Sequence, residues 1–490
     1  MTDAVNLQAV AQRAMIDAGF APDVPAEAAI ELQAIVYQSS HVTPNAQARD
    51  LRDVLWSSID NTESRDLDQV EYAEKLADNS IRVLIGIADV DAFVARGAAL
   101  DCFAAHNTTS VYTGVKTFPM LPDELSSGIT SLLEDVDRLG IVIEYVVSAD
   151  GAVQSSVVYR ALLRNRAQLT YEAVGAWLDE NASAPRAFTR LAGMEDQLRL
   201  QLEAANRLHA LRVENGALSF ETIETQPVMR DGEVVALRVT EHNSARDIIE
   251  NFMIAANSAM AGFLESKNVP SIRRVVRQPE RWPRIVELAA TFGAQLPAQP
   301  NARALADFLA ARKAADPLHF PDISLAIVKL LGPGEYVVEQ RGVTPENEEG
   351  HFGLAVPDYT HATAPNRRYA DLITQRLVKA IISSADTPYT VAELMLIAGH
   401  CTERESAARK VARHMRKVAA ALLLSKRIGE EFDAIVTGAN DKGTFARTLA
   451  PPVDGRIVRG EAGLDVGDKV RVRLLSTDSQ RGFIDFARAE

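Results

Sequence analysis

The chain has 490 residues, 47% hydrophobic and 24% charged, a balance typical of a globular protein with a large core and about two to four domains. Its formal net charge of −14 argues against a protein that coats nucleic acid without specificity, but it leaves room for a local basic channel. No apolar run reaches the roughly 18–20 residues needed to span a bilayer, and the N-terminus does not resemble a signal peptide.

The two cysteines, Cys102 and Cys401, lie far apart in the chain and match no metal-binding spacing. They are interpreted as free thiols in a reducing compartment. We therefore expect a cytoplasmic protein without membrane contact, and a monomer.

The first 50 residues are predicted to be helical. Apolar residues recur at helical spacing over 5–19, and Pro25 stands at a helix-start position before a second amphipathic stretch. Two interpretations stay open for this N-terminal module. It is either of helix-turn-helix type or a helical lead-in packed on the next domain.

Residues 51–425 predict an α+β domain, with strands first and helices later. Strand-like segments cover 54–60 and 81–90, and 141–163 predicts two strands joined by a turn at 149–151. Helical patterns follow at 170–180, 187–216, 245–266 and 301–315. Residues 426–490 change to short alternating strands split by Gly, Asp and Asn turns, which predicts a five-stranded OB-fold β-barrel.

An acidic stretch, "SIDNTESRDLDQVE" (58–71), follows the first predicted strand. Asp60 stands at the strand end, and Asp66 and Asp68 are two residues apart, so they face the same way in an extended segment. Such carboxylates can converge on one hard cation, and Mg²⁺ prefers oxygen ligands. A solvated acidic loop is the alternative interpretation, and Gln69 interrupts the acidic run directly after Asp68.

A second stretch, "HFGLAVPDYTHATAPNRRYADLITQRL" (351–377), places Arg367 and Arg368 between a Pro-containing turn and an amphipathic helix. Arginines at a helix start can bind phosphate together with free backbone N–H groups. Tyr359 and Tyr369 flank them and can stack on bases. The alternative is a surface turn with solvated arginines and core tyrosines, and the residues alone do not decide between the two.

This second stretch resembles the signature of the ribonuclease II family, whose catalytic region is called the RNB domain. The acidic stretch, "VYTGVKTFPMLPDELS" (111–126), "ENFMIAAN" (250–257) and the C-terminal strands, which resemble an S1-type RNA-binding domain, fit the same family. The resemblance covers residues 51–490. It implies a Mg²⁺-dependent exoribonuclease that hydrolyses single-stranded RNA processively from the 3′ end and releases nucleoside 5′-monophosphates.

The resemblance also implies roles for single residues. Asp60, Asp66 and Asp68 match three of four family aspartates that hold Mg²⁺, and Gln69 takes the place of the fourth. Arg367 matches the arginine on the scissile phosphate, so Asp68 and Arg367 are the expected catalytic residues. The residues expected to bind RNA are Tyr112, which clamps the RNA end, Tyr171, near the leaving nucleotide, Glu250, near the 3′-terminal nucleotides, and Tyr359, Arg368 and, in the barrel, Phe445.

Three departures from the family pattern qualify this picture. Gln69 brings no charge, which favours a catalytically impaired RNA-binding relative as the alternative function. "TAPNRRY" changes the usual turn but keeps both arginines, so we expect little effect. About 50 helical residues stand where the family usually has two cold-shock domains, so we expect the chain to lack them.

Two further interpretations concern helices. A DNA-binding regulator that uses the N-terminal helices is a third class of function, and it leaves the RNB signature unused. The basic helix 402–420, which includes Arg404, is either a wall of an RNA channel or an ordinary solvated face.

Overall fold

The computed structural model describes residues 6–39, 48–180, 182–223, 225–230, 232–340, 350–440 and 443–489. A seven-stranded sheet forms its centre, in the order β1-β8-β7-β4-β3-β2-β9. Its strands are β1 (Arg49–Asp50), β2 (Ser57–Asp60), β3 (Gln69–Lys75), β4 (Ile81–Ala88), β7 (Asp137–Val147), β8 (Val153–Arg164) and β9 (Ala167–Thr170). Neighbouring strands are antiparallel except in the β1–β8 and β2–β9 pairs. The apolar run of β4 is buried because this strand lies in the middle of the sheet.

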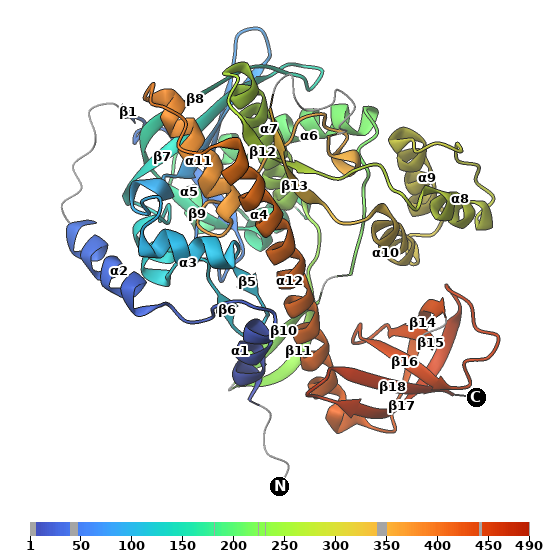
Figure 1. Cartoon of the computed structure of the whole chain (residues 1–490). Coiled ribbons are helices and arrows are strands. Elements are labelled where there is room, and N and C mark those ends of the chain that lie inside the picture. Colours follow the sequence, from blue (N-terminus) through green and yellow to red (C-terminus); the bar gives the residue numbers. More distant parts are fainter. Residues whose placement is uncertain are drawn as a thin grey trace.

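Helices and short elements surround this sheet (Figure 1). They are η1 (Val90–Ala92), α3 (Ala99–Asn107), β5 (Val111–Tyr112), β6 (Thr117–Phe118), η2 (Glu124–Ile129), α4 (Tyr171–Asp179), α5 (Arg186–Thr189), α6 (Met194–Glu214), α7 (Ser244–Ser266) and α11 (Tyr369–Ile382). The helix α6 packs on β3, β4 and β7, and α7 packs on β7 and β8. The single helix predicted for 187–216 is wrong. Gly193, with φ of 85°, adopts a left-handed conformation between α5 and α6.

A small helical lobe, defined by residues 282–331, has a core of its own around Trp282 and Phe320. It consists of α8 (Trp282–Thr291), α9 (Ala302–Ala315) and α10 (Phe320–Leu331). Two further strand pairs occur outside the central sheet. The pair β10 (Thr225–Arg230) with β11 (Glu233–Val239) precedes α7, and β12 (Ser271–Val275) pairs with β13 (Glu335–Glu339) across the lobe, which they flank in the chain. The short helix η3 (Phe352–Leu354) follows.

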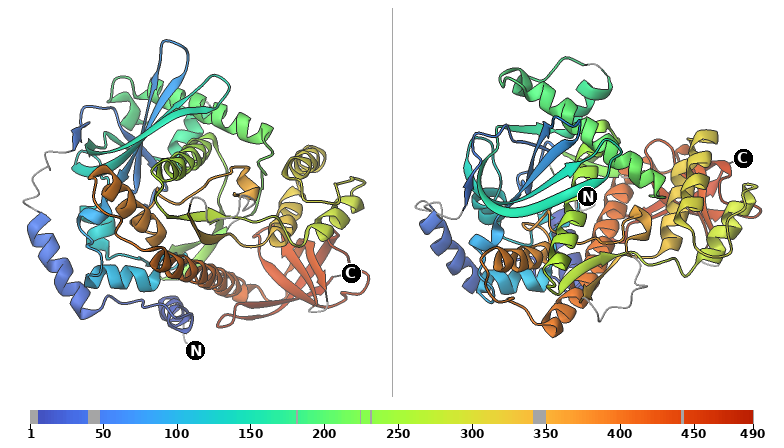
Figure 2. Two further views of the ribbon diagram at one scale, coloured as in Figure 1. Left: turned by 45° about the horizontal axis from the view of Figure 1, so that its top comes forward. Right: turned by 90° about the horizontal axis from the view of Figure 1, so that it is seen from above.

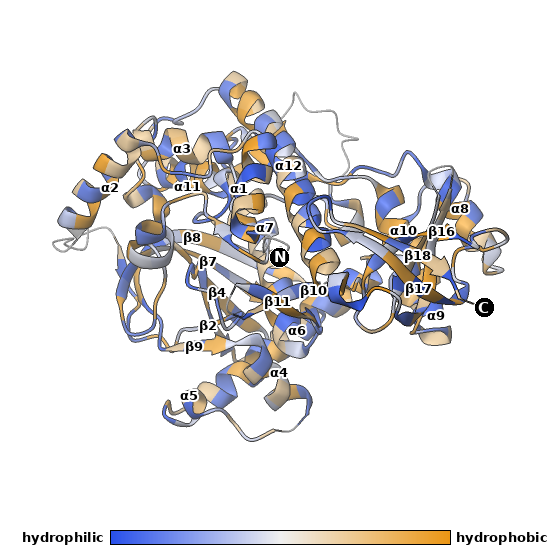
Figure 3. Ribbon diagram, turned by 90° about the horizontal axis from the view of Figure 1, so that it is seen from below, coloured by the Kyte–Doolittle hydropathy of each residue, from blue (hydrophilic) through white to orange (hydrophobic). Residues whose placement is uncertain are grey.

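One long helix, α12 (Val391–Leu424), connects the sheet region to a C-terminal barrel (Figures 1 and 2). Its 34 residues span about 51 Å, and Thr390 with Glu393 forms a capping box at its start. Apolar and polar residues alternate along it (Figure 3), as expected for a helix that buries one face.

The barrel confirms the predicted five-stranded OB-type domain. After η4 (Ser425–Arg427) come β14 (Glu431–Asn440), β15 (Gly443–Thr448), β16 (Asp454–Arg459), β17 (Lys469–Asp478) and β18 (Phe483–Arg488). They close in the order β14-β15-β16-β18-β17 around Phe486 and Val472. Arg447 of β15 and Asp322 of α10 form an ion pair of 2.8 Å, which joins the barrel to the helical lobe.

The N-terminal helices α1 (Leu7–Asp17) and α2 (Ala26–Ser39) belong to different cores. Leu7 of α1 packs in the core that contains Val411 of α12, whereas Leu32 of α2 packs in the core of the central sheet. Since the helices of a helix-turn-helix pack together as a unit, this arrangement supports the alternative, a lead-in docked on the rest of the chain. In the described residues no helix has both the length and the apolar character needed to cross a membrane.

Candidate active site

The ends of three strands bring the acidic residues together. In the antiparallel β2–β3 pair, Ser57 lies opposite Glu71, so Asp60, where β2 ends, and Gln69, where β3 begins, lie at the same end of the pair. The connecting loop carries Asp66 and Asp68. The parallel neighbour β9 places Thr170 opposite Asp60, and Tyr171 follows as the first residue of α4. Asp60, Gln69 and Tyr171 therefore lie at one end of the neighbouring strands β2, β3 and β9. This end of the sheet is called the sheet rim below.

Asp68 is the most enclosed of the three aspartates, with 1% of its surface exposed. One carboxylate oxygen accepts a hydrogen bond of 2.9 Å from the backbone N–H of Asn366, and the other accepts one of 3.1 Å from Nε of Arg367. Burial raises the pKa of Asp68 to about 7, because the Arg367 cation and the Asn366 N–H offset only part of the desolvation. The acidic stretch 58–71 and the second stretch 351–377 thus meet at this carboxylate.

Arg367 uses only one edge for this contact. The Nε atom binds Asp68, and the side chain remains 41% exposed. A guanidinium held at Nε still presents its terminal nitrogens, which match the oxygens of a phosphate. The geometry therefore suits a cationic contact for an anion at the sheet rim.

Asp66 and Asp60 have partners of their own. The hydroxyl of Tyr112 donates a hydrogen bond of 2.9 Å to Asp66, while the Tyr112 residue remains 48% exposed. Asp60 accepts hydrogen bonds of 2.7 Å from both the Ser64 hydroxyl and the Asn61 N–H. Burial nevertheless raises the pKa of Asp60. Tyr112 is therefore placed beside the acids with much of its side chain open to a ligand.

Two side chains on β3 follow the aspartates. Gln69 is 7% exposed, and Glu71, two residues further on, is fully buried. Both carboxylate oxygens of Glu71 lack a hydrogen-bond partner among the described residues. Burial, together with the charge of Asp60, raises the pKa of Glu71 well above its ordinary value.

The oxygen donors of this rim fit a hard cation in their chemistry, because carboxylates and an amide oxygen are what Mg²⁺ prefers. Their spacing is looser than a preformed cage. In the described residues the three aspartates do not bring one oxygen each within 4.8 Å of one another. Mg²⁺ usually keeps waters and substrate oxygens as ligands, so it does not need three protein carboxylates in direct contact at once. Asp60, Asp66, Asp68 and Gln69 stay predicted ligands.

Two residues expected to bind RNA have other contacts. Arg368 donates to Asp371, which is fully buried, at 2.8 Å, so its charge is neutralised inside the fold. Tyr359 is 9% exposed, and its ring lies edge-to-face with His351 and with His361. Neither side chain is presented to a ligand in this structure, because tertiary packing encloses the segment before α11.

Three further residues differ in how close they lie to the rim. Tyr171 stacks with Arg246 of α7, whose guanidinium also donates to Asn61. Glu250 lies one turn further along α7, 54% exposed and 3.9 Å from Arg212. Phe445 is partly exposed on β15 of the barrel, a different element from those that carry the acids. Their RNA contacts remain predictions.

The basic helix α12 has a mixed role. Arg404 donates to the carbonyl oxygens of Ala18 and Gly19 and stacks on Phe20, so it anchors the N-terminal segment and is not a channel residue. Arg409 pairs with Glu405 on the same helix.

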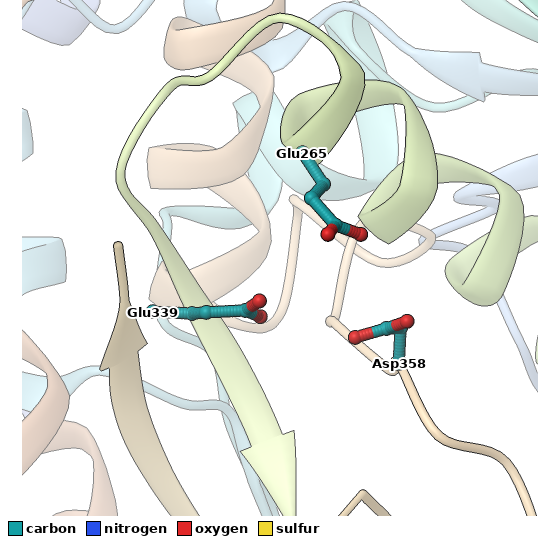
Figure 4. Close-up of side chains that lie close together, drawn as sticks. All are labelled: Glu265, Glu339 and Asp358. Carbon is teal, nitrogen blue, oxygen red and sulfur yellow. The ribbon is translucent and has the colours of Figure 1, made fainter. Parts of the chain in front are cut away.

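A second acidic group lies away from the sheet rim. Glu265, Glu339 and Asp358 point toward a common space, with carboxylate oxygens within 4.8 Å of one another (Figure 4). Arg273 donates to Glu339 and neutralises part of this charge. Sequence reasoning missed this group because its members come from three distant segments.

The two stretches that meet at Asp68 both lie within the range of one family model. A family model described as "RNB domain" matches residues 48–384, more than half of the chain. The chain belongs to the ribonuclease II family of RNB-domain proteins. A second model, "RNase II-type exonuclease C-terminal S1 domain", matches residues 430–489 of this RNB protein. The predicted family and fold are thereby confirmed.

Curated relatives of this RNB protein include Ribonuclease R 1 of Lactococcus lactis subsp. lactis, 28% identical over 474 residues. That match covers 89% of this chain and 56% of the relative. Ribonuclease R of Escherichia coli is 28% identical over 475 residues, which cover 89% of this chain and 57% of the relative. The chain thus spans little more than half the length of these relatives.

Solved structures share the fold. RNase R of Mycoplasma genitalium, in a complex with ribose-methylated single-stranded RNA, has a TM-score of 0.86 at 21% identity, covering 99% of this chain and 78% of that one. Yeast Ssd1, described as a pseudonuclease, has a TM-score of 0.68 at 16% identity, covering 90% and 57%. The RNB fold is therefore shared by proteins with different descriptions.

Some contacts of this RNB site had no signal in the sequence. The backbone N–H of Asn366 binds Asp68, and the Asn366 side chain accepts a hydrogen bond of 2.6 Å from Thr130. Backbone donors are present in every residue, so a pattern of side chains does not reveal them. The isolation of Glu71 likewise appears only once its neighbours are known.

Proposed function

We propose that this chain is a Mg²⁺-dependent hydrolase that shortens single-stranded RNA from the 3′ end, processively, and releases nucleoside 5′-monophosphates. The observation that carries the proposal is the contact between Asp68 and Arg367, which joins the acidic rim to a half-exposed guanidinium. Carboxylates for a cation beside a cation for a phosphate are the components that phosphodiester hydrolysis needs.

Each side chain has a part that follows from its contacts. Asp68 fixes Nε of Arg367, so the terminal nitrogens can donate to the non-bridging oxygens of the phosphate as negative charge grows there. The exposed part of Tyr112 can stack on a base, while its hydroxyl stays on Asp66. A Mg²⁺ ion bound by the rim oxygens supplies Lewis-acid stabilisation of the phosphate and activation of water.

Two observations support RNA as the substrate. The relatives that match most of this chain are named ribonuclease R, and the RNB fold of Mycoplasma genitalium RNase R was solved with single-stranded and with double-stranded RNA. The OB-type barrel adds a domain of the kind that binds single strands through aromatic and basic side chains.

A second candidate function is that of an RNA-binding protein with impaired catalysis. Gln69 favours it, because a neutral amide at the end of β3 attracts a cation less than a carboxylate does. The likeness of the fold to a pseudonuclease shows that an RNB fold does not guarantee activity.

The test uses the purified full chain and an unstructured oligoribonucleotide labelled at its 5′ end, with and without Mg²⁺. An active enzyme gives Mg²⁺-dependent shortening to a short 5′ product, and Asp68→Asn abolishes it while RNA binding persists. A 3′-phosphate-blocked and a DNA oligonucleotide serve as substrate controls. Tight binding of RNA that stays intact at all Mg²⁺ concentrations would establish the second candidate instead.

A further inference from the structure

Glu71 is a carboxylate that no other residue of the described fold compensates. It lies in the third strand from one edge of the central sheet, fully buried. No hydrogen bond or ion pair reaches either of its carboxylate oxygens in the part of the chain that the structure describes. Its strand neighbours Ser57 and Ile85 offer it no cation. Gln201 of α6, also fully buried, has an unpartnered side-chain oxygen of its own.

Such a group is costly. An ionised carboxylate that is removed from water without a partner destabilises the folded state by several kcal/mol, which is why buried charges are normally paired or bound to metals. A leucine or valine at this position would pack on the same strand without that cost. Since no side chain of the described fold compensates it, the Glu71 carboxyl is either held protonated by burial or ionised beside a cation from outside the protein's own side chains.

The register of the sheet indicates the side of β3 on which a compensating cation would bind. Side chains two residues apart on a strand share one face, so Gln69 and Glu71 point to the same side of β3. The charge of Asp60 acts on Glu71, and the charges of both Asp60 and Glu71 act on the Tyr171 hydroxyl. Gln69 and Glu71 therefore lie one residue pair apart on one face of β3, and Gln69 is at the end of the β2–β3 pair where β2 places Asp60.

We infer that Glu71 is a further carboxylate of the divalent-cation site and supplies, from one residue pair deeper on the same face, the negative charge that Gln69 lacks. This inference rests on the proposed function, because it takes the rim of Asp60 and Gln69 as the place of the cation. Glu71 acts as a positioning residue that holds the cation through charge. It need not touch the RNA.

The test measures cation binding directly. Mn²⁺ is titrated into the full-length protein without RNA, and free Mn²⁺ is followed by electron paramagnetic resonance. Asp60→Asn identifies the binding that belongs to the rim. Glu71→Gln, which keeps size and shape, is expected to weaken that binding by about 10- to 100-fold. Gln69→Asp in the Glu71→Gln background is expected to restore most of it.

The control variant is Glu265→Gln. Glu265 belongs to the second acidic group, is exposed, and is distant in sequence from Glu71. It should leave the rim binding unchanged, and thermal unfolding without metal checks that every variant folds. If Glu71→Gln does not fold, Gln69→Asp in the wild-type chain still decides. If Gln69→Asp alone raises the Mn²⁺ affinity as much as one added ligand carboxylate normally does, Glu71 was not supplying the missing negative charge.

Unchanged Mn²⁺ affinity in Glu71→Gln would overturn the inference, and so would a wild-type protein whose Mn²⁺ binding is insensitive to Asp60→Asn. The RNA assay separates the two proposals. Glu71-dependent Mn²⁺ binding without RNA shortening contradicts the proposed function alone. RNA shortening by a wild-type protein whose Glu71→Gln variant binds Mn²⁺ normally contradicts the role of Glu71 alone.

Discussion

Two consecutive arginines of the chain have different partners and therefore different expected phenotypes. Arg367 contacts Asp68 with Nε and remains 41% exposed, whereas Arg368 pairs with the fully buried Asp371. The neighbouring positions in "NRRY" alternate between the sheet rim and the interior. Substitution at the first should affect chemistry, and substitution at the second should affect folding.

Arg367→Lys is expected to lower kcat for RNA shortening by about 100- to 1,000-fold, since a lysine cannot hold Asp68 and a phosphate with one planar fork. The unfolding midpoint in urea should change little, because the side chain is partly solvated. Steady-state kinetics on a labelled oligonucleotide measure the effect. A change confined to KM would show that Arg367 only binds the substrate.

Arg368→Met is expected to destabilise the protein by about 3–5 kcal/mol, because it leaves Asp371 buried without its cation. The double variant Arg368→Met with Asp371→Leu removes both charges and should recover much of this loss. Urea unfolding followed by circular dichroism measures both. Equal stability of Arg368→Met and wild type would mean that the ion pair contributes nothing.

At the scale of elements, the segment 350–368 that leads into α11 contains two histidines that resist protonation. Burial lowers the pKa of His351 to about 4, and burial together with the charges of Arg368 and Arg274 lowers the pKa of His361 well below its ordinary 6.5. The His361 ring nitrogen Nδ1 lies 2.8 Å from the hydroxyl of Tyr336. The unfolded chain binds these protons more readily than the folded one does.

Acidification should therefore destabilise the protein through these histidines. Their contribution is complete above pH 6.5 and is lost as the pH falls toward 4. Near pH 5, keeping one such histidine neutral in the folded state lowers the free energy of unfolding by about 2 kcal/mol. Asp68 acts in the opposite direction, since its pKa is raised to about 7. The measurement is therefore the difference between wild type and His361→Gln in urea midpoints at neutral and acidic pH. The variant should lose less stability on acidification, and an identical loss would contradict the assignment.

The elements themselves could be predicted in part. The hairpin β7–β8, the buried strand β4 and the barrel strands follow from alternation and turn residues, because local pattern and tertiary burial agree there. The β10–β11 and β12–β13 pairs and α8 and α10 were missed, since short strands and helices that depend on contacts with distant segments have weak local signals.

The site, too, could be predicted only in part. Asp68 and Arg367 were singled out because the motifs that contain them are specific, and the structure brings these two side chains into contact, while their roles stay predictions. The enclosure of Tyr359 and the pairing of Arg368 could not be found that way. Both depend on partners that are decided by packing between segments, such as His351 and His361 around the tyrosine ring.

At the scale of the whole molecule, the barrel and the helical lobe are held together by Arg447 and Asp322. Both side chains are nearly buried, and two nitrogens of the guanidinium bind the two carboxylate oxygens at 2.8 and 3.1 Å. Arg447→Ala leaves Asp322 uncompensated, so the barrel is expected to separate from the lobe. Small-angle X-ray scattering should then show a larger radius of gyration.

The charge-swapped double variant Asp322→Arg with Arg447→Asp is the matched control. It should return the radius of gyration toward that of the wild type, because the pair is re-formed in the opposite orientation. If Arg447→Ala scatters like the wild type, the Arg447–Asp322 pair is not what holds the barrel on the lobe.

The contact between α1 and α12 has a consequence for how the chain is made. Arg404 binds the carbonyl oxygens of Ala18 and Gly19 across 386 and 385 residues of sequence. During synthesis at about 5–20 residues per second, roughly 20–80 s pass between the appearance of the two partners at the ribosome. A helix of 11 residues is marginal by itself in water, and α1 lacks the α12 part of its core during that interval. The segment that contains α1 is thus made long before the helix it packs on, and the part of its apolar face that α12 covers stays open to chaperones and proteases until α12 has been made.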